Sequence, residues 1–116
     1  MFARVERIAI HLRPGATDLR KGINGLIGIV EDQMKLDTLS GSLFLFCNAQ
    51  RKLLKALYWD TTGFCLWQKR LESHYRFPWP QSPQEALAID VKQLRMMLSG
   101  IDCWAAHEPL KYESVV

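Results

Sequence analysis

Basic and aromatic side chains are concentrated in one apolar stretch of the chain, residues 44–71. They are Arg51, Lys52, Lys55, Trp59, Trp67, Lys69 and Arg70. Cations attract phosphate groups and flat aromatic rings stack on exposed bases, so this combination suits a nucleic-acid surface. The alternative is a half-buried hairpin in which the tryptophans are core residues and the cations are solvated. The residue types alone leave both interpretations open.

Residues 60–63, Asp-Thr-Thr-Gly, supply a strong turn signal in the middle of this stretch. Asp at the first position and Gly at the last fit a type I turn with a left-handed Gly, which predicts a three-residue hairpin loop with a bulge. In that register Asp60 lies opposite Phe64, and Lys55 lies directly opposite Lys69. Opposed like charges repel unless an anion or water lies between them. The sequence therefore predicts a basic and aromatic hairpin face that meets a partner.

A second pair of cations, Arg20 and Lys21, lies in the first turn of a long helix predicted over residues 17–35. Thr17 is a suitable N-cap, and Asp18 complements the positive end of the helix dipole. The apolar residues that recur at helical spacing are Leu19, Ile23, Leu26, Ile27, Val30 and Met34. Basic residues in a first turn oppose the dipole, so they are either a solvated face or part of an anion site.

Three glycines, Gly22, Gly25 and Gly28, lie within this predicted helix. Each costs on the order of 1 kcal/mol relative to Ala in a helix. A regular row of them predicts that the helix backbone packs closely on the sheet or on another helix, and a flexible helix is the alternative. The row lacks the Lys-Ser/Thr pair and the strand-to-helix junction of a phosphate-binding loop.

The remaining elements complete an α+β fold. Period-two alternation predicts a strand over residues 7–12, and a continuous apolar run predicts a buried strand over residues 42–47. Phe77 and Trp79, in a proline-rich loop, are predicted to fold back onto the core. A short strand over residues 86–89 and a short helix with Asp90 as its N-cap follow. We predict a single domain, residues 1–116, with an antiparallel sheet of four to five strands, one long N-terminal helix and a short C-terminal helix.

Composition limits the classes of protein that remain. The chain has 116 residues and a net charge of +3, which permits a nucleic-acid partner without demanding one. Its three cysteines, Cys47, Cys65 and Cys103, are widely spaced among apolar residues and are expected to be free thiols. The N-terminal segment lacks the apolar run of a signal peptide, and no run is long enough to span a membrane, so a cytoplasmic protein is expected.

Residues for catalysis do not form a known signature. The chain has no Gly-x-Ser-x-Gly, His-Glu-x-x-His or Walker sequence. Its scattered carboxylates include Asp18, Asp37, Asp60, Glu72, Asp90 and Asp102. A two-metal nuclease would need several of them to converge on a metal pair. We therefore expect a protein that is not an enzyme and has no cofactor or metal.

Several motifs, in order and spacing, resemble the second small open-reading-frame protein of insertion sequence 66 elements, the TnpB or Orf2-like family. They are Thr17 to Gly22, Gly25-Leu26, Gly41 to Phe46, Lys55 to Asp60, Gly63-Phe64, Lys69 to Glu72, Phe77 and Trp79-Pro80. The resemblance covers about nine tenths of the chain. The sequence departs from the family pattern at residues 73–75, where a Gly-containing turn is more usual, and in a shorter, less basic tail.

The resemblance implies a non-catalytic accessory protein for DNA transposition. Its partners would be the element-encoded transposase, a second accessory protein and DNA. The binding residues would be those of the hairpin together with Arg20 and Lys21. The alternative is a protein–protein interaction module that makes no contact with nucleic acid.

Overall fold

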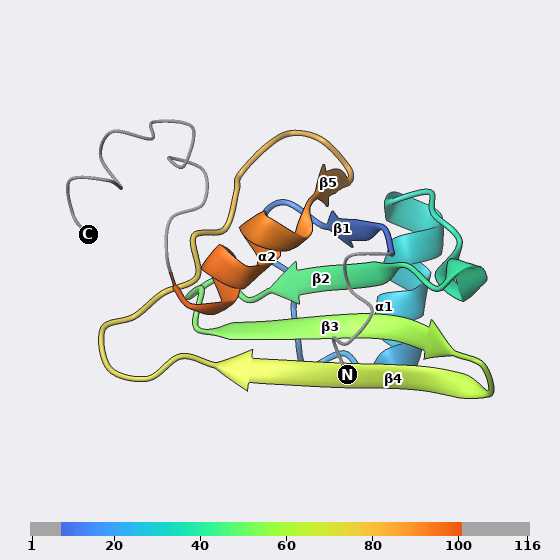
Figure 1. The fold of residues 1–116 in the computed structure, drawn as a ribbon, viewed down its shortest axis with the longest axis horizontal. Helices are drawn as coiled ribbons and strands as arrows, with labels where there is room; N and C mark the ends of the chain where they lie inside the picture. Colours follow the sequence, from blue (N-terminus) through green and yellow to red (C-terminus); the bar gives the residue numbers. More distant parts are fainter. Residues whose placement is uncertain (1–7, 101–116) are drawn as a thin grey trace.

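The computed structural model describes residues 8–100 of the chain. Its elements form one sheet with helices on both sides (Figure 1). In chain order they are β1 (Ile10–Leu12), α1 (Ile23–Gly28), the π-helix η2 (Ile29–Gln33), the 3-10 helix η3 (Thr38–Ser40), β2 (Leu43–Cys47), β3 (Leu53–Asp60), β4 (Gly63–Arg70), β5 (Leu87–Ile89) and α2 (Val91–Leu98).

The five strands lie in the order β4-β3-β2-β1-β5. The pair β1–β2 is parallel, whereas β2–β3, β3–β4 and β1–β5 are antiparallel. The predicted antiparallel sheet is therefore wrong, and the sheet is mixed. The physical reason is the connection from β1 to β2, which runs through α1 and η2 and returns the chain to the same end of the sheet. Apolar alternation within a strand carries no information about the direction of its neighbour.

All five side chains of β2 are buried, so both faces of the sheet need a covering layer. On one face Leu54 and Ala56 pack with Leu94 and Met97 of α2. On the other face the buried residues of the sheet and of the first helical segment form a second cluster. Its buried members are Leu19, Leu26, Ile29, Val30, Met34, Phe44, Phe46 and Leu57. The two clusters together form the core of the domain.

The predicted long N-terminal helix is wrong, because α1 has six residues and continues only into the five-residue π-helix η2. Asp18 does not act at the helix start. Its carboxylate accepts the backbone N–H of Arg20 at 3.0 Å and closes a tight turn instead. The helix then begins after Gly22, which is extended and provides no side-chain cap. It ends before Lys35, whose φ of 60° is left-handed.

The segment before α1 is held against the end of β2 rather than coiled. Thr17 is buried, and its N–H donates to the carbonyl of Cys47 at 2.8 Å. The hydroxyl of Thr17 accepts a hydrogen bond from the Arg13 guanidinium at 3.0 Å. Thr17 therefore anchors a loop to the sheet, and its predicted role as an N-cap is wrong.

The three glycines Gly22, Gly25 and Gly28 do not lie where the helix backbone packs closely on a neighbour, so the predicted close packing is wrong. A Cβ atom added at Gly22 or Gly28 would meet nothing within 4 Å. At Gly25 the three atoms nearest to the added Cβ all belong to the side chain of Lys21, the first at 2.9 Å. The glycines therefore weaken the helix without bringing its backbone against a neighbour, which fits the short α1.

The hairpin register differs from the predicted one by one residue. Asp60 pairs with Gly63, so only Thr61 and Thr62 lie in the loop. Thr61, with a φ of 50°, takes the left-handed position predicted for Gly63. A shift of one residue moves every side chain of one strand to the other face of the sheet. The predicted basic and aromatic face is therefore divided between the two faces.

Other predicted elements are confirmed. Strands form at Ile10–Leu12, Leu43–Cys47 and Leu87–Ile89. Phe77 and Trp79 are buried in the core that α2 covers. Asp90 forms a complete capping box with Gln93, and Gly100, just past the end of α2, has a φ of +77°. Cys103, which was predicted to be a free thiol, lies outside the described residues.

Replacement of Gly28 by Ala should stabilise the domain. Gly28 has helical angles, φ −57° and ψ −40°, and open space around its missing Cβ. Removing glycine from a helix interior is expected to raise the free energy of unfolding by about 1 kcal/mol. Gly41→Ala is the matched control, because Gly41 also has open space but a φ of +85°. It should lower that free energy by about 1 kcal/mol. Urea unfolding of both variants checks the opposite signs, and equal effects would contradict this account.

Candidate nucleic-acid and partner interface

Lys55 and Lys69 do not face each other, which corrects the predicted opposed pair. Lys55 pairs with Gln68 across the hairpin, and Lys69 pairs with Leu54. The Lys55 ammonium donates to the carbonyl of Leu19 at 2.7 Å, on the side of α1. The Lys69 ammonium donates to the carbonyl of Leu98 at 2.7 Å, at the end of α2. The two lysines thus tie flanking segments to opposite faces of the sheet.

The two predicted aromatic residues are also separated. Trp59 lies near the hairpin tip, where its ring makes an edge contact with Phe64 at a centroid distance of 5.0 Å. Trp67 pairs with Ala56 and packs against the core on the α2 side. Both side chains are half-buried. The predicted combination of Trp59, Trp67, Lys55 and Lys69 on one surface is therefore not formed.

The structure instead places cations on the β2–β3 loop and on the segments hydrogen-bonded to it, near the point where β2 and β4 end and β3 begins. We call this region the basic end, and its residues are Arg20, Lys21, Arg51, Lys52, Arg70 and Arg76. Three segments converge there on the residues around the β2–β3 loop. The N–H groups of Thr17, Leu71 and Phe77 donate to the carbonyls of Cys47, Lys52 and Arg51, each at 2.8 Å.

Asn48 shapes the loop that presents Arg51. Its side-chain oxygen accepts the N–H groups of Lys52 at 3.0 Å and Leu53 at 3.1 Å. Its carbonyl accepts the N–H of Arg51 at 3.0 Å. Arg51 itself has a left-handed φ of 60°. The exposed Arg51 side chain is therefore fixed at its base by a hydrogen-bonded loop.

Three of the cations at the basic end have local partners. Arg20 forms a salt bridge with Asp18 at 2.9 Å, and Arg70 forms one with Glu72 at 2.9 Å. The Lys52 ammonium donates to the carbonyl of Tyr75 at 2.8 Å and also to that of Ser73. Lys52 thus holds the loop after β4 in place, and its capacity to bind a partner is reduced.

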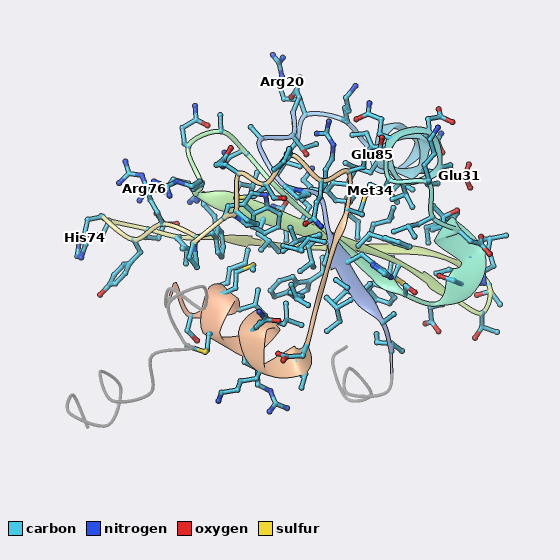
Figure 2. All side chains as sticks on the ribbon, turned by 90° about the horizontal axis from the view of Figure 1, so that it is seen from above. Arg20, Glu31, Met34, His74, Arg76 and Glu85 are labelled. Carbon is cyan, nitrogen blue, oxygen red and sulfur yellow. The ribbon has the colours of Figure 1, made fainter. Side chains whose placement is uncertain are left out.

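The other three, Lys21, Arg51 and Arg76, are exposed. Their side chains make no hydrogen bond or salt bridge within residues 8–100. Sequence reasoning missed Arg76. Its neighbour Phe77 was predicted to enter the core, and that prediction could have indicated that Arg76 points outward. Figure 2 shows Arg76 and Arg20 at the periphery of the molecule.

A groove of about 500 Å³ lies beside these cations. Its walls are the segment before α1 and the β2–β3 loop. The lining residues are Ala16, Thr17, Asp18, Leu19, Arg20, Asn48, Ala49, Gln50 and Leu53. The groove combines backbone polar groups and the Arg20–Asp18 pair with apolar side chains, so it suits a ligand that is itself part polar.

Arg20 lowers the pKa of Asp18 from 3.8 to about 2. The main cause is the side-chain hydrogen bond between them, at 2.9 and 3.0 Å, and the Arg20 N–H adds to it. In return, Asp18 raises the pKa of Arg20. A lowered carboxyl pKa means that the pair is fully formed above about pH 4 and is lost as the pH falls through about 2. At neutral pH the pair is intact.

Charge is distributed unevenly along the molecule, whose longest extent is 45 Å. The end opposite the basic end contains η2, η3 and the hairpin tip. Its carboxylates are Glu31, Asp32, Asp37 and Asp60. Figure 2 shows Glu31 at this end and Arg76 and His74 at the other. Residues 8–100 therefore have an acidic end, which also carries the exposed Lys35, and a basic end.

The described residues contain no group of three His, Cys, Asp or Glu side chains that could hold a metal ion. They therefore do not form the carboxylate cluster that a two-metal nuclease needs. Cys47 and Cys65 are free thiols, and burial raises the pKa of Cys47 to about 12. None of the helices described here has the length and apolar character needed to cross a membrane.

The fold and the basic end together define a small α+β protein with a cluster of exposed basic side chains. Comparison with known proteins identifies the family of this chain. The model of the family described as IS66 Orf2 like protein matches residues 8–108. The chain belongs to this IS66 Orf2-like family, which associates it with transposition of an insertion sequence. The resemblance seen in the sequence is thereby confirmed.

Two curated relatives come from Sinorhizobium fredii, and both are named as uncharacterized proteins. The protein y4hO is 39% identical over 102 residues, which cover 88% of this chain and 88% of that protein. The protein y4jC is 31% identical over 96 residues, which cover 83% of this chain and 80% of that protein. No solved structure matches the chain significantly.

Substitution of Arg20 by Ala should raise the pKa of Asp18 from about 2 toward its ordinary value of 3.8, because the main hydrogen bond that stabilises the carboxylate is removed. An NMR titration of the Asp18 carboxyl carbon measures the change. Arg70→Ala removes an equal charge from another salt bridge and should leave the pKa of Asp18 in place. A similar shift in both variants would contradict the local origin of the effect.

Proposed function

We propose that this protein is a non-catalytic accessory factor for transposition that binds the DNA of its insertion sequence through the basic end. The observation that carries the proposal is the presence of six basic side chains on the β2–β3 loop and on the segments hydrogen-bonded to it, three of which make no hydrogen bond or salt bridge within residues 8–100. Membership of the IS66 Orf2-like family supports the connection with transposition. The cytoplasm, where bacterial DNA lies, would be its site of action.

The chemistry of the basic end supports a phosphate backbone as the ligand. Lys21, Arg51 and Arg76 can each approach a phosphate without first breaking a salt bridge. Arg20 and Arg70 would have to exchange a carboxylate for a phosphate, so they would contribute less. Contacts of this kind fix the position of a protein on DNA but carry no base sequence. Sequence preference would then come from the transposase or from the shape of the DNA.

Lys55 and Lys69 take no part in this proposal. Both are half-buried, and both donate to backbone carbonyls on opposite faces of the sheet. Trp59 and Trp67 are likewise omitted as base-stacking residues, because each packs within the fold. The proposed surface therefore retains the predicted residues Arg20, Lys21, Arg51 and Arg70, adds Arg76 and assigns Lys52 a supporting role.

The second candidate function is a protein-interaction module that binds the transposase or the second accessory protein without DNA. The groove between the segment before α1 and the β2–β3 loop favours it, because a side chain of a partner could enter there. This candidate predicts association with the transposase that changes little with salt, and no retention on DNA. The two functions differ in the dependence of binding on ionic strength.

Replacement of the free arginines should weaken DNA binding. In the double variant Arg51→Asn with Arg76→Ala, Asn is chosen because it tolerates the left-handed backbone of Arg51. Loss of two phosphate contacts should reduce the slope of log K against log salt by about 2 and the affinity about tenfold at moderate salt. Gel-shift titrations with element-end DNA at several salt concentrations measure both quantities.

The matched control is Lys35→Asn with Lys92→Ala. It also removes two exposed cations, one of them at a left-handed φ, but both lie away from the basic end. It should bind DNA nearly as well as the unmodified chain. If both double variants lost the same affinity for DNA, binding would depend only on the net charge of the protein and not on the basic end. Unchanged binding in the first variant would overturn the proposed surface.

A further inference from the structure

The outer edge of β4 is the longest open strand edge among the described residues. β4 has eight residues and pairs only with β3, whereas the opposite edge of the sheet is the three-residue strand β5. An open edge presents a row of N–H and C=O groups without partners, which is a template for another strand. Figure 1 shows β4 along one side of the sheet, with no described element beyond it.

The register identifies which groups point outward. In an antiparallel pair, residues alternate between those bonded to the neighbouring strand and those bonded to nothing on that side. Leu71, just after β4, donates its N–H to the carbonyl of Lys52 at 2.8 Å. The odd-numbered residues of β4 therefore bond to β3. The outward-facing backbone groups belong to Phe64, Leu66, Gln68 and Arg70.

Most of this edge lacks the features that discourage strand pairing. Residues 63–67 contain no charge and no proline, and a strand of this kind is prone to add a neighbour. Phe64 and Leu66 border the core on the α1 side, while Trp67 borders it on the α2 side, and all three are only half-buried. An added strand would cover these side chains on both faces.

We propose that β4 pairs with β4 of a second copy of this chain, in antiparallel orientation, to form a two-fold dimer with one continuous sheet. The distribution of charge along the hairpin favours a second copy of this chain as the partner and favours antiparallel pairing. Each hairpin carries Asp60 at its tip and Lys69 and Arg70 at its base, where Glu72 offsets one cation. Antiparallel pairing sets the tip of one copy beside the base of the other. Parallel pairing would set the two bases side by side, and like charges in that position repel.

The distribution of charge over residues 8–100 agrees with this direction. The antiparallel arrangement brings the acidic end of each copy toward the basic end of its partner, and the two-fold axis closes the assembly at two chains. This inference goes beyond the DNA-binding proposal and does not depend on it, because its readout is molecular mass.

Gln68→Pro tests the proposal directly. The outward N–H of Gln68 takes no part in the β3–β4 pairing, so proline at this edge position should preserve the fold while removing a hydrogen bond to the second copy. Sedimentation equilibrium of the full chain should give twice 13.4 kDa for the unmodified protein and 13.4 kDa for the variant. Gln68→Ala is the control and should remain dimeric. A monomer at every concentration, or a dimer that persists in Gln68→Pro, would overturn the proposal.

Charge reversal tests the direction of pairing. Asp60→Lys or Arg70→Asp alone should weaken the dimer about fivefold at low salt, because each change acts twice across the two-fold axis. The double variant Asp60→Lys with Arg70→Asp should restore it, since the opposite charges again meet. A double variant weaker than either single variant would rule out the antiparallel arrangement.

Hydrogen exchange of the unmodified chain gives a measurement that needs no variant. The amides of Leu66 and Gln68 should exchange slowly at concentrations where the protein is dimeric and rapidly on dilution. Slow exchange at every concentration in a monomer would mean that another part of the same chain covers this edge, and the proposal would fail.

Discussion

Five consecutive buried residues in β2 impose the main constraint on this fold. No face of that strand can be left to water, because burying each large apolar side chain contributes about 1.5–3 kcal/mol. The sheet must therefore carry a layer on each side, and the chain supplies α1 on one and α2 on the other. The two clusters share no buried residue. β3 contributes buried residues to both of them, and so does β2, which is buried along its whole length. Loss of either layer would expose one face of the same strand.

The elements that the sequence predicted well are those whose signals are local. The capping box at Asp90 lies within four residues, and the apolar run of β2 allows few alternatives. The long helix was predicted on apolar spacing, which extends back to Leu19. The apolar residues at this spacing do face the core, since Leu19 is buried in the same cluster as Leu26. What the spacing could not reveal is that Asp18 closes a turn and Gly22 extends the chain before the helix begins.

The site illustrates a different limit. Residue types identified most of the cations of the basic end, but not which of them would be free. For Lys52 that distinction depends on a contact with a segment distant in sequence, the loop at Tyr75, whereas Arg20 and Arg70 pair with carboxylates only two residues away. The sequence also did not settle the register of the hairpin. A loop of two residues rather than three decides on which face of the sheet each cation lies. Sequence reasoning therefore located the surface only approximately.

The position of β1 has a consequence for how the chain folds. This strand comes near the start of the sequence, yet it lies between β2 and β5, and Ile10 pairs with Ile89 across almost the whole described chain. Pairings this distant are slow to form, because a long loop must close before any contact rewards it. During synthesis, the pairing of β1 with β5 must wait until residues 87–89 have left the ribosome. The domain should therefore reach its final form late, and truncation before β5 would leave one side of β1 without its neighbour.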